Sequence, residues 1–238
     1  SGEPTLHTGF GEVLKFLQKS PIPSALLTNG SMLYRPEVRE AASYANLVKI
    51  SLSAWDQHSF WWINRPHPEL KFEQLIEGQK NFRIQFKGEL WMEVLLMLGM
   101  NSMPDDVKKI AAFVQEIRPD RIQLNTVVRP PAENFAVALS NERLKILSRL
   151  FDPPAEVIAE CSIDHVKDIQ VSEDGILSML KRRPCTTEQI GQAFNMHINE
   201  VSKHLSRLME TYRIHTDYIN TNIYYSAAIK EKALDVNT

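Results

Sequence analysis

The chain has 238 residues, enough for one large domain or for one medium and one small domain, each with its own core. Hydrophobic residues make up 43% and charged residues 24%, and the net charge of −2 argues against a protein that mainly coats nucleic acid. No apolar run reaches the length of a membrane span, so we expect no membrane contact. The two cysteines, Cys161 and Cys185, fit neither a disulfide framework nor a metal ligand set, which predicts reduced thiols in a cytoplasmic protein.

Up to about residue 168, short apolar runs alternate with helical patterns. The runs that we predict to be strands are 24–28, 47–53, 90–97, 121–128 and 155–159. Helical spacing predicts helices over 12–19, 36–44, 72–86, 104–117 and 140–151. Near-continuous apolar strands are typical of sheets covered on both faces, and their alternation with helices predicts an α/β fold with a parallel sheet or an open barrel.

The pattern changes after residue 170. Three helices are expected over 172–181, 186–194 and 198–212, followed by a β-hairpin over 214–227. The second helix opens with a T-x-x-Q capping box that begins at Thr186. Three helices and a hairpin in this order predict a small C-terminal winged helix-turn-helix domain. We therefore expect domains at 1–168 and 169–228, and a polar tail at 229–238.

Polar residues follow the predicted strands of the first domain. Residues 28–31 end the first strand, 51–56 follow the second, and Asn125–Thr126 close the fourth. Each alone is typical of a turn or a helix cap, but parallel strands bring their carboxyl ends to one rim, where binding groups lie. Glu93 lies inside an apolar strand and needs a partner or a polar cavity, because an unpaired buried carboxylate is costly.

Tryptophans are concentrated just after the second predicted strand. Trp55, Trp61 and Trp62 predict a helix that packs its aromatic face under the barrel. The alternative is a substrate platform. The sequence leaves both interpretations open.

Two segments together resemble the radical S-adenosylmethionine (radical SAM) enzymes: Gly-Glu-Pro-Thr-Leu-His at 2–7, and Leu-Leu-Thr-Asn-Gly-Ser at 26–31. The segments 63–68 and 123–133 are similar to one branch, the proteins related to wyosine-base synthases of transfer RNA. The resemblance covers roughly residues 1–160. It implies a partial (β/α) barrel, S-adenosylmethionine as cofactor, a 4Fe-4S cluster, and an electron donor such as a flavodoxin or ferredoxin. By the branch alone, the unknown substrate is transfer RNA or a related nucleic acid.

The resemblance also implies cofactor contacts, but it assigns no catalytic residue. The residues concerned are Gly2, Glu3, Pro4, Thr28, Asn29, Gly30, Ser51, Ser53 and Asn125. Residues 2–4 would form the loop that binds the methionyl amino group, with the Glu3 carboxylate facing the ammonium. Residues 28–30 would form the next rim loop, Ser51 and Ser53 would contact the ribose, and Asn125 would lie near the adenine or the substrate.

The family's Cys-x3-Cys-x2-Cys motif does not occur in these 238 residues. Three thiolates hold the cluster in that family, so we expect no metal ligands here and no 5′-deoxyadenosyl radical from this chain alone. Because the chain begins inside a binding loop, we expect a carboxy-terminal fragment of a longer enzyme that cleaves S-adenosylmethionine reductively. A degenerate, cluster-free paralogue is the alternative.

The predicted winged helix carries its own candidate contacts. Lys203, His204 and Arg207 on its recognition helix are candidates for nucleic-acid contact. Glu200 and Glu210 share that helix, so protein docking or substrate presentation is the alternative. For the whole chain, the rival hypothesis is a cluster-free DNA-binding or protein-interaction regulator whose barrel half senses a ligand. A barrel without its first strands exposes a sheet edge, so we also expect a homodimer.

Overall fold

The computed structural model describes residues 2–128, 136–158, 172–219 and 222–228. The chain divides into two compact units, the first made of 1–97, 101–130 and 138–166, the second of 98–100, 131–137 and 167–238. The expected domain boundary at 168, the expected tail at 229–238 and Cys161 lie outside the described residues. No helix in the described part of the chain has the length and apolar character that crossing a membrane requires.

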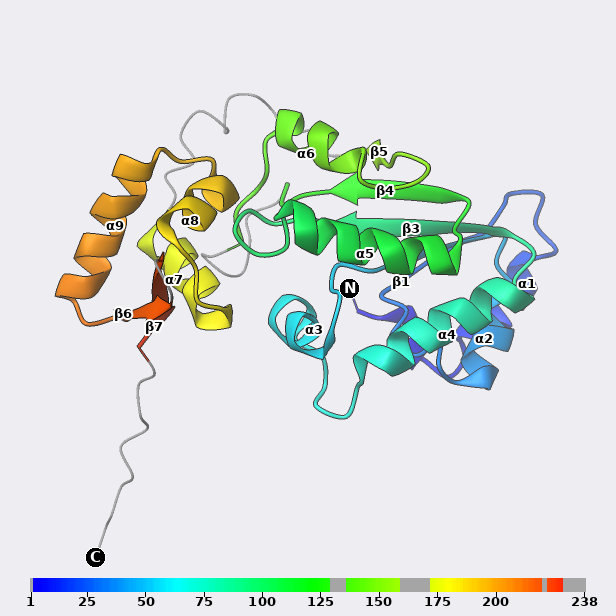
Figure 1. Ribbon diagram of the computed structural model, residues 1–238. Coiled ribbons are helices and arrows are strands. Elements are labelled where there is room, and N and C mark those ends of the chain that lie inside the picture. Colours follow the sequence, from blue (N-terminus) through cyan, green and yellow to red (C-terminus); the bar gives the residue numbers. More distant parts are fainter. Residues whose placement is uncertain (1, 129–135, 159–171, 220–221, 229–238) are drawn as a thin grey trace, which may run out of the picture. The chain divides into compact units, whose positions relative to one another are not determined.

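The first unit is built on a five-stranded parallel sheet with the strand order β1-β2-β3-β4-β5 (Figure 1). Its strands are β1 (Ala25–Thr28), β2 (Leu47–Ser51), β3 (Glu89–Leu95), β4 (Arg121–Asn125) and β5 (Glu156–Val157). Its helices are η1 (Pro4–Leu6), α1 (Phe10–Leu17), α2 (Pro36–Ala42), α3 (Gln57–Asn64), α4 (Phe72–Gln85), α5 (Pro104–Ile117) and α6 (Asn141–Ser148). The α/β fold with a parallel sheet is confirmed, with element boundaries shifted by a few residues.

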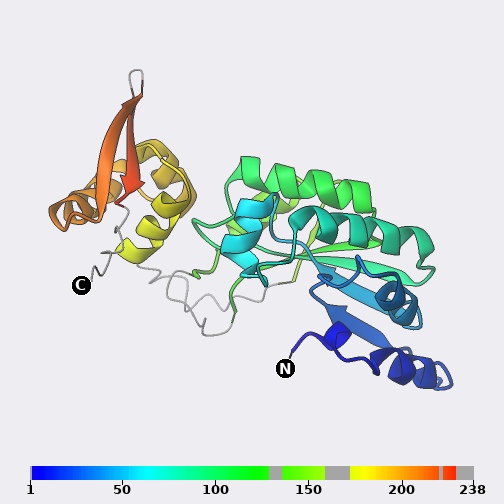
Figure 2. The ribbon, with the colours of Figure 1, turned by 90° about the horizontal axis from the view of Figure 1, so that it is seen from below.

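Helices cover one face of this sheet. The strand order follows the chain order, and right-handed crossovers then place successive helices on the same side. Figure 2 shows α4 and α5 together on that side. The even-numbered side chains of β2 and β3 are completely buried there: Val48, Ile50, Leu90, Met92 and Val94. The odd-numbered side chains of these strands are more exposed and face the opposite side. The helix-covered face of β2 and β3 is thus fully buried, and the opposite face is only partly buried.

Helix α3 occupies the tryptophan-rich segment, as one interpretation of the sequence predicted. A capping box starts it, in which Asp56 Oδ1 accepts a hydrogen bond from Ser59 N at 2.6 Å. This start sets the phase of the helix, and Phe60 becomes the buried aromatic residue at 3% exposure. Trp61 is 49% exposed, so the expected inward packing of the aromatic face is wrong at that position.

Helix α4 approaches the chain after β1 closely at Gly78. A Cβ atom built on Gly78 would lie 2.4 Å from Tyr34 N and 2.6 Å from the Leu33 carbonyl carbon. Because both atoms are backbone, Gly78→Ala is expected to lower the free energy of unfolding by about 2 kcal/mol in urea titrations followed by circular dichroism. In the control, Gly175→Ala, no atom is closer than 3.6 Å to the built Cβ, and stability should be unchanged or higher. Equal stability of Gly78→Ala and the parent would contradict this packing.

The second unit contains three helices followed by an antiparallel hairpin, in the order that the sequence predicts. The elements are α7 (Glu173–Arg182), α8 (Thr187–Phe194), α9 (Ile198–Glu210), β6 (Ile214–Ile219) and β7 (Asn222–Ala227). The predicted capping box is present, since Thr186 Oγ1 accepts from Gln189 N and Gln189 Oε1 accepts from Thr186 N. Cys185 pairs with Tyr225 through two backbone hydrogen bonds of 3.0 and 2.9 Å, which ties the chain before α8 to the hairpin.

Candidate functional site

Glu3 ties the amino-terminal segment to the carboxyl end of β1. Its Oε1 accepts hydrogen bonds from Thr5 N at 3.0 Å, from Thr5 Oγ1 at 2.5 Å and from Thr28 Oγ1 at 2.5 Å. Its Oε2 accepts a single bond, from Asn29 N at 2.7 Å. A carboxylate oxygen has about two acceptor positions, so Oε1 is saturated and Oε2 has room for one more donor. Glu3 therefore clamps the loop and keeps one open acceptor position on Oε2.

Glu93 has the polar partners that its position in an apolar strand predicts. Lys49 Nζ forms a salt bridge with Glu93 Oε2, and Asn125 Nδ2 donates to Glu93 Oε1 at 3.2 Å. The Lys49 and Glu93 side chains are only 19% and 21% exposed. The three residues come from β2, β3 and β4, and they lie on the face of the sheet opposite to the helices. A polar line of one ammonium, one carboxylate and one amide thus crosses three neighbouring strands.

The Glu3 clamp and the Lys49–Glu93 pair both line a pocket of about 340 Å³ at the carboxyl end of the sheet. Its lining residues are Gly2, Glu3, Pro4, Leu27, Thr28, Asn29, Lys49, Ser51 and Glu93. The pocket brings together two carboxylates, one ammonium, and the hydroxyls of Thr28 and Ser51. Sequence reasoning did not select Lys49. The signal was the same as for Glu93, a charged residue inside a predicted apolar strand.

Three of the predicted cofactor residues do not line this pocket. Gly30 has a φ of +74°, which favours glycine, and it forms the turn after β1. Ser53 is 4% exposed, and its Oγ accepts from Leu95 N at 3.0 Å, so it joins the ends of β2 and β3. Asn125 is linked to the pocket through its bond to Glu93.

A second hollow, of about 610 Å³, shares Asn29 with the pocket. One part of its lining is apolar and aromatic, with Leu6, Phe60 and Leu70 among its residues. The other part is polar and includes Arg65 and further residues of the segment after α3. Together the two hollows provide room beside the charged groups for a molecule larger than an amino acid.

The predicted nucleic-acid contacts lie in the second unit, on α9. Lys203 is exposed, and Arg207 Nη1 lies 3.6 Å from Glu173 Oε1 of α7. His204 Nδ1 is buried and makes no hydrogen bond within the described part of the chain. Lys203 and Arg207 are one helical turn apart and share a face, as the sequence predicts.

The side chains that the structure describes do not fit an iron–sulfur cluster. No group of three or more His, Cys, Asp or Glu residues that could hold a metal occurs within residues 2–128, 136–158, 172–219 and 222–228. Cys185 is the one cysteine in the described part of the chain and is buried in the second unit, whereas a [4Fe–4S] cluster requires several thiolates.

Comparison with known proteins places the chain among several bacterial and archaeal relatives, although no protein-family model matches it. It is 32% identical over 236 residues to the GTPase Obg of Brachyspira hyodysenteriae, which is 96% of this chain but 34% of that protein. It is 28% identical to a UPF0026 protein of Methanocaldococcus jannaschii and 29% identical to one of Helicobacter pylori, covering 62% and 73% of their lengths. The chain thus spans about a third of the first relative and less than two thirds of the second.

Among solved structures, the fold is similar to a domain of pyruvate-formate lyase-activating enzyme from Bacteroides vulgatus. The TM-score is 0.52 at 18% identity, and the match covers 66% of this chain and 93% of that domain. A radical SAM methyltransferase from Sphaerobacter thermophilus is also similar, with a TM-score of 0.44. The first of these likenesses shows that this chain shares the α/β fold of that domain.

Proposed function

We propose that the first unit is the S-adenosylmethionine-binding part of a radical SAM protein. The observation that carries the proposal is the pocket at the carboxyl end of the parallel sheet, where the carboxylates of Glu3 and Glu93 lie with the ammonium of Lys49. S-adenosylmethionine carries an ammonium, a carboxylate and a sulfonium. The two carboxylates of the pocket complement the ammonium and the sulfonium, and its ammonium complements the carboxylate. Hydrogen bonds between charged groups are stronger than those between neutral groups.

Each group has a defined task in this proposal. The free acceptor position on Glu3 Oε2 receives the ligand ammonium, since Oε1 is already saturated by Thr5 and Thr28. Lys49 has three N–H donors, so it can hold the ligand carboxylate and remain paired with Glu93. Glu93 then supplies the negative charge that attracts the sulfonium. The adjoining hollow that shares Asn29 receives the rest of the ligand or the substrate.

An iron–sulfur cluster, when bound in such proteins, supplies the electron that cleaves S-adenosylmethionine. The thiolates of that cluster come from no described residue of this chain. In this proposal, residues 2–4, 28–29, 49, 51 and 93 bind and orient the cofactor. The wyosine-related branch, transfer RNA as the substrate, and a flavodoxin or ferredoxin as the electron donor stay predictions. We propose in addition that the second unit is a winged helix, on the basis of its element order α7-α8-α9-β6-β7.

Isothermal titration calorimetry of the 238-residue chain with S-adenosylmethionine tests the first proposal. Lys49→Met and Glu93→Gln are each expected to weaken binding about tenfold or more, because the first removes a charge-assisted hydrogen bond to the ligand carboxylate and the second removes the charge that attracts the sulfonium. Glu89→Gln, a carboxylate at the opposite end of β3, is the control and should bind like the parent.

A second titration, with S-adenosylhomocysteine, isolates the sulfonium. This compound lacks the positive sulfur, so the parent should prefer S-adenosylmethionine, and Glu93→Gln should reduce that preference. No binding of S-adenosylmethionine at millimolar concentration would refute the proposal. So would unchanged affinity in both Lys49→Met and Glu93→Gln.

A further inference from the structure

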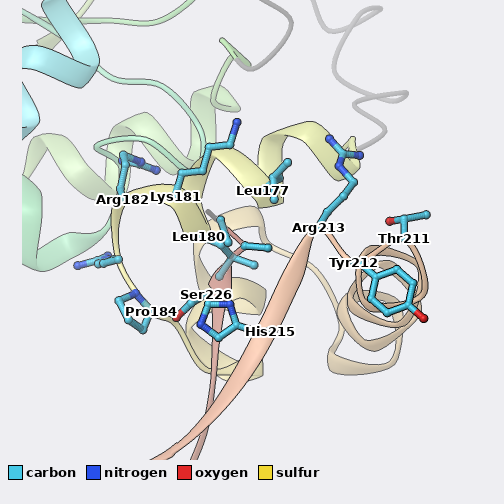
Figure 3. Close-up of a pocket in the computed structure, with 13 residues that line it drawn as sticks. Leu177, Leu180, Lys181, Arg182, Pro184, Thr211, Tyr212, Arg213, His215 and Ser226 are labelled. Carbon is cyan, nitrogen blue, oxygen red and sulfur yellow. The ribbon is translucent and has the colours of Figure 1, made fainter. Parts of the chain in front are cut away.

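The second unit contains a larger pocket, of about 950 Å³, that the proposed cofactor site does not involve (Figure 3). It lies between the last turn of α7, the corner that joins α9 to β6, and the ends of β6 and β7 nearest that corner. Its lining residues are Leu177, Leu180, Lys181, Arg182, Arg183, Pro184, Thr211, Tyr212, Arg213, His215, Ser226, Ala227 and Ala228. The volume is at the upper end of the ~300–1,000 Å³ typical of ligand sites and exceeds the needs of a single inorganic anion.

Charge is strongly segregated toward this pocket. The described residues from 172 to 228 contain six lysines and arginines and six aspartates and glutamates, so they carry no net charge apart from histidine. Four of the six cations line the pocket, and none of the six carboxylate residues does. The four are Lys181, Arg182, Arg183 and Arg213. A concave surface lined by charges of one sign concentrates the electrostatic potential, which here attracts anions.

Some of these charges already have partners. Arg213 Nη2 lies 2.5 Å from Asp174 Oδ1, and Arg182 donates to the carbonyl oxygens of Gly99 and Met100. Lys181 and Arg183 are exposed. In Figure 3 the Lys181 and Arg213 side chains extend toward the same side of the pocket. Among the described residues, the lining of the pocket thus contains four cationic side chains and no carboxylate.

The pocket also has an aromatic side chain and two hydroxyls. Tyr212 lines it and is 88% exposed, on a backbone with a φ of +54° at the corner after α9. The Thr211 hydroxyl already donates to Arg207 O at 2.9 Å and the Ser226 hydroxyl to Asp217 Oδ2 at 3.4 Å, so the cationic side chains are the groups that would contact phosphate oxygens. An exposed aromatic ring beside a cationic groove is the arrangement that binds single-stranded nucleic acids, with bases stacked on the ring and phosphates on the cations.

The pocket is a better anion site than α9, where the sequence pattern placed the nucleic-acid contacts. On α9, Lys203 and Arg207 share the helix with Glu200 and Glu210, and Arg207 lies near Glu173. We infer that the pocket, rather than the outer face of α9, binds a single-stranded nucleic acid. In the bound state, the phosphates of the nucleic acid contact Lys181, Arg183 and Arg213, and one of its bases stacks on Tyr212.

Fluorescence anisotropy of the 238-residue chain with a labelled oligonucleotide of about 12 nucleotides, either oligo-uridine or oligo-thymidine, tests this inference. The double variant Lys181→Ala/Arg183→Ala is expected to bind about tenfold more weakly or worse at ~0.1 M salt. The slope of log K against log salt should become shallower by about 1.4, or about 0.7 for each lost phosphate contact on a single strand. Tyr212→Ala should lose about fivefold or more in affinity with the salt slope unchanged, because stacking carries no charge.

The control is Lys203→Ala/Arg207→Ala, which removes the same charge from α9 and should bind within twofold of the parent. Circular dichroism confirms that each variant is folded. Equal losses in the two double variants, tighter binding of a duplex than of the single strand, or equal competition by poly-glutamate would each overturn the inference. None of the residues changed in these variants lines the proposed cofactor pocket, so the outcome of this test is independent of S-adenosylmethionine binding.

Discussion

Replacing Asn101 with alanine is expected to lower the free energy of unfolding of the first unit by about 4 kcal/mol. Asn101 is completely buried, and its side chain satisfies three backbone groups. Its Oδ1 accepts from Met97 N at 2.8 Å, and its Nδ2 donates to Ser53 O at 2.9 Å and to Leu95 O at 2.8 Å. Alanine leaves all three without a side-chain partner in the interior, and each such group costs about 1–3 kcal/mol.

The measurement can be confined to the unit concerned. All four tryptophans, at positions 55, 61, 62 and 91, belong to the first unit, so tryptophan fluorescence in urea reports on its unfolding. Asn101→Asp keeps the acceptor for Met97 N but turns a carboxylate toward two carbonyl oxygens, and it should be at least as unstable as Asn101→Ala. Asn64→Ala, at the exposed end of α3, should stay within about 0.5 kcal/mol of the parent. If Asn101→Ala lowers the free energy of unfolding by less than about 1 kcal/mol, the hydrogen bonds of the Asn101 side chain do not hold the strand ends together.

Replacing Glu3 with alanine is expected to release the amino-terminal segment from the sheet. The change removes four hydrogen bonds, two from backbone N–H groups and two from hydroxyls. Bonds to a charged acceptor are worth about 1.5–3 kcal/mol each, and losing part of this set should raise amide exchange at Thr5 and Asn29 by about 100-fold. Hydrogen exchange read by mass spectrometry on peptides covering 2–12 and 25–35 provides the measurement.

The matched variant is Glu12→Ala, which removes an exposed carboxylate from the first turn of α1. It should leave exchange in both peptides unchanged. Glu3→Gln keeps the side-chain oxygen as an acceptor and should fall between the parent and Glu3→Ala. If exchange at Asn29 is the same in Glu3→Ala and in the parent, the carboxylate does not anchor the loop, and its role in the proposed cofactor pocket must be revised.

Local patterns were sufficient to predict most elements of the fold. Strands appear as short apolar runs, and helix starts as capping residues such as Ser140, whose side chain accepts from Arg143 N, and Thr186. The capping chemistry acts over three or four residues, so a single sequence carries the whole signal. The phase of a helix is less certain, as the exposure of Trp61 and the burial of Phe60 show.

The candidate site was only partly predictable. The strand order of a parallel sheet explains why residues at several strand ends meet at one rim, and the need of Glu93 for a partner followed from its apolar neighbours. The identity of that partner, Lys49, depends on the register of β2 against β3. This register pairs Ser51 with Glu93 and therefore places Lys49, two residues before Ser51, on the same face as Glu93. The basic pocket likewise requires β7 to return beside β6, because that pairing brings Ser226 next to His215.

The sequence by itself therefore determined the α/β class, the helix starts, the rim where polar residues gather and the anomaly at Glu93. Only the tertiary structure decided that Glu3 clamps Thr28 and Asn29, and that four of the cations in the second unit line one pocket. The physical reason is the separation along the chain over which each interaction acts. Hydrophobic periodicity and capping act between near neighbours in the chain, whereas the charged contacts join residues that only strand register and helix packing bring together.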